Sequence, residues 1–425
     1  MTNASNRPAD SSPGPATGPA PGTVLPLTDL RVIEVGTMVA GPYASAILCD
    51  LGAEVIKLES PGGDALRRSV KFAGTEHWFS ECNRGKKSLG LDLTSPRGQE
   101  ILWRLVAGSD AILYNLRPDT VPKLGLSYQD LHRVNPRVVA VQVSAFGSEG
   151  PWGQRRGTAP TIDGSSGISR INGDQETGPL KPPNLFGDLA AAFFAALGVV
   201  AAVRAARLTG QGEHLDVAMT ECVSHMLGEP VLTELVLGQP RAPSGNRHDY
   251  AAPHGCYPCS GEDRWIAIAV ECDADWHRFV AAAGGQAWAG DPDYATMASR
   301  LAHRDKLDRD VARWTEGHDA DELMVALQSA GVASGVVSSP RRVSTDAQLA
   351  ARGYFGPVPN NYGPPDPIPR FPGRPERAEG DRSRAPEYSE HAGQILGDLL
   401  GLAPAEVTSL YQEGVCFPPQ DQASH

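Results

Sequence analysis

The stretch LRVIEVGTMVAGPYASAILCDLGAEVIKLE, residues 30–59, decides the fold. Two short apolar runs, LRVIEV (30–35) and EVIKLE (54–59), have the length of buried strands, and GPYASAILCDLGA (41–53) between them favours a helix. Strands that alternate with helices form a parallel sheet, and such sheets are covered by helices on both faces. The stretch therefore predicts an α/β fold.

The same alternation continues along the first third of the chain. Further strands are expected at SLGLDL (88–93), AILYNL (111–116) and VVAVQV (138–143). Ser95 and Pro96 are typical of a helix start, and they open a helix over 95–109. Ligands of parallel sheets bind beyond the carboxyl ends of the strands. A ligand is therefore expected in the loops at 36–42, 60–67, 115–118 and 144–151.

The later sequence predicts a second, smaller α+β domain and a return to the first. Strands are expected at 264–270 and 332–339, with helices between them. Proline and glycine crowd residues 356–373, which we interpret as a linker, and short amphipathic helices follow at 389–401 and 403–414. We expect a disordered tail at 1–25, a large domain at 26–228, a small domain at 229–340, and a linker with C-terminal helices at 341–425 that returns to the large domain.

Composition and charge exclude several classes of partner. The chain has 425 residues, 41% of them hydrophobic, and a formal net charge of −12. This charge argues against nucleic acid or an anionic membrane as the main partner. No apolar run approaches the roughly 20 residues of a membrane span, and the N-terminus lacks the pattern of a secretory signal. Seven dispersed cysteines fit reduced thiols, so we expect a cytoplasmic protein.

Two short motifs resemble cofactor or metal sites but lack the full pattern of either. Cys256 and Cys259 form a single C-x-x-C without a second pair, so no metal site is expected. EVGTMVAGP (34–42) lacks the G-x-G-x-x-G spacing of a dinucleotide fingerprint. We therefore expect no tightly bound cofactor.

One acid stands at the start of a very apolar helix. In NLFGDLAAAFFAAL (184–197), Asp188 precedes Leu189, Phe193 and Leu197, an apolar stripe at helical spacing. Such an acid commonly caps its helix by accepting hydrogen bonds from the first-turn N–H groups. Taken alone, the stretch does not distinguish a cap from a reactive carboxylate.

Several motifs, taken in order, resemble the family III CoA-transferases. This is the CaiB–BaiF family, which includes formyl-CoA and carnitine CoA-transferases, and the similarity extends from about residue 26 to 416. The segments that carry it are residues 27–67, NRGKKSLGLDL (83–93), 114–139, FGSEGPW (146–152), NLFGDLAAA (184–192), TGQGEHLDVAMTECV (209–223), 339–355 and 389–399.

The resemblance implies a function and gives Asp188 a role in it. It implies a Rossmann-like large domain, coenzyme A as substrate and product, a small carboxylic acid as acceptor, and an interlocked homodimer. The acid of the G-D pair is the covalent nucleophile in this family, and the motif places that role on Asp188. A carboxylate that attacks a thioester forms a mixed anhydride and then an aspartyl-CoA thioester, so a difficult exchange is divided into easier steps. The Pro/Gly-rich return at 356–373 is long enough to wrap a partner subunit.

The resemblance also implies which residues contact CoA. They are Val39, Lys86, Lys87, Asn115, Leu116, Arg117, Lys123 and Phe146. The alternative for each lysine is a solvated surface charge.

Two departures from the family pattern concern the substrate. Ser60 and Pro61 stand where some members have an arginine that meets the adenine, so Arg67 or Arg68 is the candidate replacement. RHDYAAPHGC (247–256) lacks the glycine-rich loop of the formyl-CoA transferases. An acyl group other than formyl or oxalyl is therefore expected.

Two alternatives to transfer stay open: an α-methylacyl-CoA racemase of the same family, and a non-catalytic acyl-CoA-binding protein in which Asp188 is only a cap. A racemase needs an acid and a base on opposite faces of the substrate. The family's racemases have a His-Asp pair about 30 residues before the G-D acid, where this chain has Thr158 and Ala159. No histidine occurs between 133 and 213, and Asp163 is more simply read as a cap, so transfer is favoured over racemisation.

Overall fold

The computed structural model describes residues 25–68, 77–174, 176–183, 185–238, 242–359, 365–373 and 383–419. Apart from Leu25, the expected tail at 1–25 lies outside these residues. The chain forms two compact units: Met1–Thr158, Gly187–Cys222 and Tyr354–His425 make up the first, and Ala159–Phe186 and Val223–Gly353 the second. Residues 159–186, which the sequence assigned to the large domain, thus cluster with the second unit.

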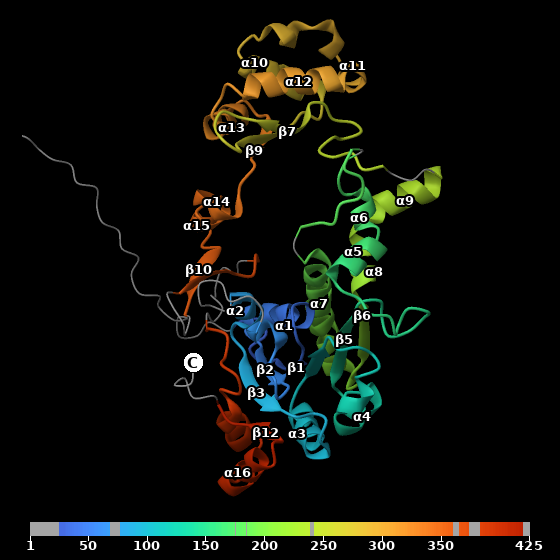
Figure 1. Ribbon diagram of the computed structural model, residues 1–425, viewed down its shortest axis with the longest axis vertical. Coiled ribbons are helices and arrows are strands. Elements are labelled where there is room, and N and C mark those ends of the chain that lie inside the picture. Colours follow the sequence, from blue (N-terminus) through green and yellow to red (C-terminus); the bar gives the residue numbers. More distant parts are fainter. Residues whose placement is uncertain are drawn as a thin grey trace, which may run out of the picture. The chain divides into compact units, whose positions relative to one another are not determined.

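The first unit is built on one large sheet, in which the described residues form seven strands (Figure 1). Its order is β12-β3-β2-β1-β4-β5-β6, and every neighbouring pair is parallel except β12 with β3. The strands are β1 (Arg31–Val35), β2 (Glu54–Glu59), β3 (Lys87–Leu91), β4 (Ala111–Tyr114), β5 (Val139–Ser144), β6 (His214–Ala218) and β12 (Cys416–Phe417). The predicted α/β class and parallel sheet are confirmed.

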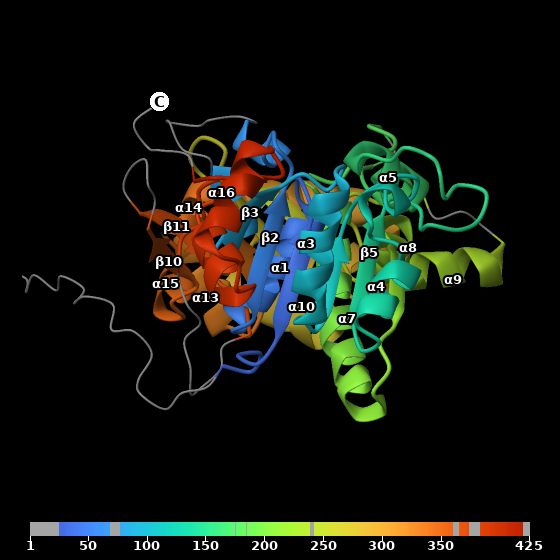
Figure 2. The ribbon, with the colours of Figure 1, turned by 90° about the horizontal axis from the view of Figure 1, so that it is seen from below.

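Helices cover both faces of this sheet. Alternate strand residues such as Ile33, Ile56 and Ile112 pack into a core with helices α3 (Pro96–Ala107), α4 (Tyr128–Val134) and α16 (Pro404–Gln412). Figure 2 shows α3 and α16 on this side of the strands. The opposite face is covered by α1 (Ala40–Asp50) and α7 (Phe186–Thr209).

Smaller elements complete the first unit. They are α2 (His77–Asn83), the first turns of α8 (Met219–Met226), the 3-10 turns Ala65–Arg67 and Pro122–Leu124, a hairpin of β10 (Phe355–Val358) with β11 (Asp366–Pro369), and a π-helix at Gln394–Leu399. The segment that we interpreted as a linker thus contains a paired hairpin, and the helix expected at 389–401 is a shorter π-helix.

Local chemistry accounts for the start of α3. The Ser95 hydroxyl accepts a hydrogen bond from the backbone N–H of Gly98, at 3.0 Å, and Pro96 occupies the first helical position. The proline has no N–H, and an N–H at this position has no partner within the helix, so the ring costs nothing there. This helix follows the prediction closely.

Helix α7 buries alanine rather than its large apolar side chains. Ala191, Ala195 and Val199 are buried, whereas Phe193 and Leu197 of the predicted stripe are 44% and 65% exposed. Small residues let the helix approach the sheet closely, and a Cβ at Gly198 would lie 3.1 Å from Leu215 of β6.

Helix α7 also corrects the expectation that no stretch has the length and composition of a membrane span. An 18-residue window within it reaches a mean hydropathy of 2.1. Half of that window is buried inside the protein, as in the core helix of a globular domain.

The C-terminal segment returns to the first unit and covers the edge of the sheet at β3. Ser389 accepts a hydrogen bond from the Gly90 N–H at 3.0 Å and donates its own N–H to Ser88 Oγ at 2.9 Å. Its hydroxyl also bonds the carbonyl of Phe417 in β12. Since an open strand edge is a site for unwanted pairing, these bonds complete the sheet.

The second unit has its own core. Strands β7 (His254–Pro258), β8 (Trp265–Ala269) and β9 (Ala333–Val336) form an antiparallel sheet in that order. Its helices are α5 (Ala159–Ser165), α6 (Ile168–Ile171), α9 (Gly228–Leu237), α10 (Asp273–Ala282), α11 (Met297–Ala302), α12 (Arg304–Thr315), α13 (Ala320–Ser329), α14 (Pro340–Ser344) and α15 (Ala347–Ala351), with 3-10 turns at Ala287–Gly290 and Pro292–Tyr294. The core contains Trp276, Phe279 and Trp314. A fully buried Arg300 lies against Trp276 and bonds Asp273.

We predict that Gly90→Ala destabilises the protein by about 1–3 kcal/mol, because overpacking a tight site forces its neighbours to move. A Cβ at Gly90 would lie 2.5 Å from the Tyr388 hydroxyl. Gly397→Ala is the matched control, since nothing lies within 4 Å of a Cβ there. Denaturant unfolding measures both changes. Tyr388→Ala should recover part of the loss in the Gly90→Ala background, and strictly additive effects would contradict the proposed clash.

Candidate active site

The carboxyl edge of the main sheet brings Asp188 to the loops predicted to bind ligand. Helix α7 ends at Thr209, just before β6 begins at the amino edge, so its N-terminus lies at the carboxyl edge. Phe193, in its second turn, contacts Tyr43 in the first turn of α1, with ring centroids 6.3 Å apart. Asp188, five residues nearer the start of α7, therefore lies at the same end of the sheet as the loop between β1 and α1.

Asp188 occupies the first turn of α7 and is half-buried. The helix begins at Phe186, so Asp188 is its third residue and not the residue that precedes it. Gly187, beside it, is buried. The positive end of a helix dipole favours a negative charge at this position.

Asn115 fixes the loop between β1 and α1. Its side-chain amide donates to the Thr37 carbonyl at 2.8 Å and accepts from the Thr37 N–H at 3.0 Å. The next residue, Met38, has a φ of 64°, a left-handed conformation that costs energy for a residue with a side chain. Val39 is buried at the start of α1. Asn115, one of the predicted CoA contacts, therefore holds this loop in a strained conformation.

A cavity of about 400 Å³ opens at the carboxyl ends of β1, β2 and β3. Its walls include the apolar side chains of Val35, Leu58, Leu91, Leu116 and Leu124. Ser60, Pro61, Asp64, Thr94 and Arg68 are among its polar and rim residues.

The two arginines proposed as replacements differ in this cavity. Arg67 bonds Glu59 through Nε at 2.7 Å and stacks on Phe79. Arg68 is exposed and lines the cavity. The structure therefore leaves Arg68, and not Arg67, facing the cavity.

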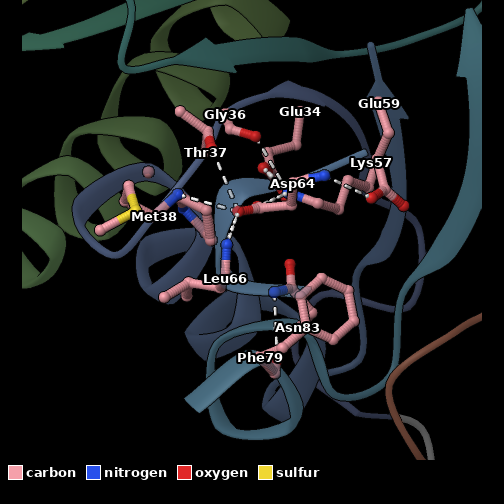
Figure 3. Close-up of polar contacts among 12 residues, drawn as sticks. Glu34, Gly36, Thr37, Met38, Lys57, Glu59, Asp64, Leu66, Phe79 and Asn83 are labelled. Atoms are coloured by element: carbon pink, nitrogen blue, oxygen red, sulfur yellow. Dashed lines mark hydrogen bonds and ion pairs between the residues drawn. The ribbon is translucent and has the colours of Figure 1, made fainter. Parts of the chain in front are cut away.

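Beneath the cavity lies a buried cluster of charges (Figure 3). The Lys57 ammonium lies 2.9 Å from Glu34 Oε1 and 2.9 Å from Asp64 Oδ2. Glu34 also pairs with the Lys86 ammonium at 2.7 Å, and these four side chains are buried. With the pair of Glu59 and Arg67, the cluster contains three carboxylates and three cations.

Charge pairing overrides burial at the centre of this cluster. Burial lowers the pKa of Lys57, but the carboxylates of Glu34, Asp64 and Glu59 outweigh it and hold that pKa above its ordinary value. Burial raises the pKa of Asp64, and Lys57 outweighs it in the other direction, so this carboxyl stays ionised at neutral pH. Asp64 Oδ1 also accepts from the N–H groups of Met38, at 3.1 Å, and Leu66, at 2.9 Å. The cluster thus holds the β1–α1 loop from below.

Four further predicted contact residues lie on loops at the carboxyl edge. Leu116 lines the cavity, and Arg117 is exposed and pairs with Asp119 at 3.0 Å. Lys123 is an exposed residue of the turn after β4. Phe146 follows β5, and its ring meets that of Trp152.

Lys86 and Lys87 lie elsewhere. The Lys86 ammonium is enclosed by Glu34, the Pro42 carbonyl and Asn83, and it is neither the ligand contact nor the solvated charge expected from the sequence. Burial is the larger influence on it and lowers the pKa of Lys86. Lys87 starts β3 at the amino edge, where it pairs with Glu54 at 2.7 Å. The predicted site residues that the structure places at the carboxyl edge are therefore those that follow β1, β4 and β5, with Asp188 at the same edge.

The sequence reasoning missed the charge cluster and the loop that it supports. A signal was present, because Glu34 and Lys57 each interrupt an otherwise apolar strand and the two strands were expected to be neighbours. Their direct pairing across β1 and β2 follows from the register. Within the part of the chain that the structure describes, no group of three or more His, Cys, Asp or Glu side chains is arranged to hold a metal ion.

We predict that Lys57→Met destabilises the protein by about 3–5 kcal/mol at pH 8, because it leaves buried carboxylates without their cation. Lys87→Met is the control: its pair with Glu54 is partly exposed, and its loss should cost less than about 1 kcal/mol. Without Lys57, burial raises the pKa of Asp64, so the folded variant takes up protons as the pH falls. The loss in the free energy of unfolding, measured with urea for the variant against the unaltered protein, should therefore become smaller from pH 8 to pH 5. A deficit independent of pH would contradict this assignment.

Comparison with known proteins agrees with this geometry. The profile of CoA-transferase family III matches residues 27–392. The succinyl-CoA–D-citramalate CoA-transferase of Chloroflexus aurantiacus is 32% identical over 397 residues, which cover 92% of this chain and 98% of that protein. The succinate–glutarate CoA-transferase of Agrobacterium fabrum is 30% identical over 387 residues, or 88% and 96% of the two chains.

A solved structure has the same fold. The crystal structure of a CaiB/BaiF family protein from Brucella suis superposes with a TM-score of 0.81 and 31% sequence identity, and covers 88% of this chain and 99% of that one. The chain therefore belongs to CoA-transferase family III, the CaiB/BaiF family, and is an enzyme of that family.

Proposed function

We propose that this enzyme transfers CoA from succinyl-CoA or a related dicarboxylic acyl-CoA to a dicarboxylic acid, with Asp188 as the covalent nucleophile. The position of Asp188 carries the proposal: it lies in the first turn of a 24-residue helix, at the sheet edge where the ligand loops meet. The substrate class rests on the two relatives, whose names contain succinyl-CoA and D-citramalate, or succinate and glutarate.

Each step exchanges one bond to a carbonyl carbon. The Asp188 carboxylate attacks the thioester carbonyl, the C–S bond breaks, and CoA leaves as a thiolate from a mixed anhydride. The thiolate then attacks the aspartyl carbonyl, which forms an aspartyl-CoA thioester and releases the donor acid. The acceptor carboxylate attacks that thioester and expels the thiolate, which then attacks the acceptor acyl group and frees Asp188. The dipole of α7 stabilises the carboxylate and the oxyanions that form beside it.

We place the nucleotide end of CoA in the cavity at β1, β2 and β3. The cavity has apolar walls suited to a flat base, and the exposed Arg68 lines it within reach of a phosphate. From there the pantetheine arm passes the loop that Asn115 holds and brings the thioester to α7. The proposed contacts to CoA along or beyond this path remain Val39, Leu116, Lys123 and Phe146. Lys86 acts instead through the buried cluster.

We predict that Asp188→Asn and Asp188→Ala each lower the transfer rate by at least about 1,000-fold, because an amide or a methyl group cannot form the anhydride. CoA binding, measured by calorimetry, should change little. Hydroxylamine added during turnover should convert Asp188 of the unaltered enzyme to a hydroxamate, identified by peptide mass.

Near-normal turnover of Asp188→Asn would refute the nucleophile. Retained acyl-CoA binding by the unaltered enzyme, with no hydroxamate from any acyl-CoA, would favour a non-catalytic binding protein.

We also propose that the enzyme is a homodimer. Helix α9 exposes Leu232, Leu235, Val236 and Leu237, each at least 61%, and it buries none of its side chains. In the first unit, α7 exposes Phe193 and Leu197. Monomeric proteins rarely leave such apolar surface uncovered, so a second copy of the chain is the proposed cover.

We predict that Leu235→Glu/Val236→Glu converts a dimer to a monomer at micromolar concentration, because two buried charges would oppose association. The control is Val325→Glu on α13, a side chain that is 59% exposed in the second unit. Light scattering coupled to size exclusion gives the mass of each. A monomeric mass for the unaltered enzyme would contradict the dimer.

A further inference from the structure

The loop that follows β5 is unusually well fixed for a surface segment. Asp216 Oδ2 accepts from both the N–H and the hydroxyl of Ser148, each at 2.6 Å. Glycines permit two close approaches: a Cβ at Gly153 would lie 2.6 Å from the Ser148 carbonyl oxygen, and one at Gly157 would lie 2.2 Å from the Ala145 Cβ. The loop is therefore closed on itself and clamped to β6.

This loop carries a platform of aromatic rings under one arginine. Phe146 and Trp152 meet edge to face with centroids 5.4 Å apart. The Arg155 guanidinium carbon lies 4.8 Å from the centroid of the Trp152 ring. Such stacking attracts the cation and restricts its side chain, yet it leaves the N–H groups at the rim free to donate.

Arg155 differs from three other arginines at this end of the sheet, which are held by carboxylates. Arg67 pairs with Glu59, Arg84 with Asp50, and Arg117 with Asp119. Within the described parts of the chain, the Arg155 guanidinium has no carboxylate partner. Residues 145–157 contain two arginines and a single acid, Glu149, so the loop is cationic.

The strand order places the β5 loop, and Arg155 with it, away from the nucleotide cavity and on the side of the sheet that α7 covers. From β2, at the nucleotide cavity, the order runs through β1 and β4 to β5, where the loop begins. These three steps span roughly 14 Å at the usual strand spacing. Helix α7 contacts α1 through Phe193 and β6 through Gly198, so it lies on the β5–β6 side of α1, and Asp188 lies on that side of the nucleotide cavity. A CoA thioester that enters from the cavity therefore directs its acyl group toward the β5 loop.

We infer that Arg155, stacked on Trp152, binds the free distal carboxylate of a dicarboxylic acyl group while its other end is bonded to CoA or to Asp188. The inference rests on the proposed function and extends it, because it assigns the residue that selects dicarboxylic over monocarboxylic acyl groups. A guanidinium suits this role, since its N–H groups match the two oxygens of a carboxylate.

The test compares succinyl-CoA with butyryl-CoA, which replaces the distal carboxylate by a methyl group, at one acceptor acid. Arg155→Gln should lower kcat/KM for succinyl-CoA by about 10- to 100-fold, mainly through KM, and leave that for butyryl-CoA unchanged. Arg155→Lys should lower kcat/KM for succinyl-CoA by less than Arg155→Gln does, because it keeps the positive charge. Arg156→Gln is the matched control, because Arg156 is also exposed and, in the described structure, makes no ring contact. Arg156→Gln should leave kcat/KM unchanged for both donors.

The other outcomes separate the two levels of the proposal. An equal loss with both donors would show that Arg155 contacts CoA itself, and no loss with either would show that it contacts nothing; both overturn the inference. Transfer among monocarboxylic acids alone, still dependent on Asp188, would overturn it and the dicarboxylate substrate class while the nucleophile stands. An unaltered enzyme that transfers CoA from neither donor would overturn the proposed function as well.

Discussion

The buried ion cluster around Lys57 is the constraint on which the carboxyl edge of the sheet depends. One ammonium group joins Glu34 on β1 to Asp64 in the loop after β2, and Asp64 in turn holds the strained backbone at Met38. Ions buried in this way are stable only when each is matched by an opposite charge. Lys86 supplies the second cation to Glu34, so the cluster is balanced without solvent. The position of the β1–α1 loop, and with it the entrance of α1, therefore follows from electrostatics beneath the site.

The site above the buried ion cluster contains polar groups that are already hydrogen-bonded to one another. Asn115 uses both ends of its amide on Thr37, and Asp216 clamps Ser148 in the loop after β5. Preorganisation of this kind reduces the reorganisation that a reaction with developing charge requires. Asp188 is placed differently, by a helix whose alanine face allows it to lie close to the sheet.

The packing of α7 links the site to the surface of the molecule. Because small residues face the sheet, the large side chains of Phe193 and Leu197 are left outside. A helix that buried these residues would stand farther from β6 and move its first turn away from the loops. Close packing at the site and exposed apolar surface are thus two consequences of one sequence pattern, and the second gives a physical reason to expect association.

The sequence by itself determined the α/β class, most strands of the main sheet, and the presence of an acid at the start of α7, because strand length and helix periodicity are local properties. The role of Asp188 came from the family resemblance. Only the tertiary structure decided which charges meet. Lys86 and Lys87 are neighbours in the chain, yet one is enclosed beside Glu34 and the other pairs with Glu54 at the amino edge. Likewise Arg67 is bound by Glu59 while Arg68 lines the cavity. The energy of a charge depends on its burial and on partners distant in sequence, and no local pattern contains that information.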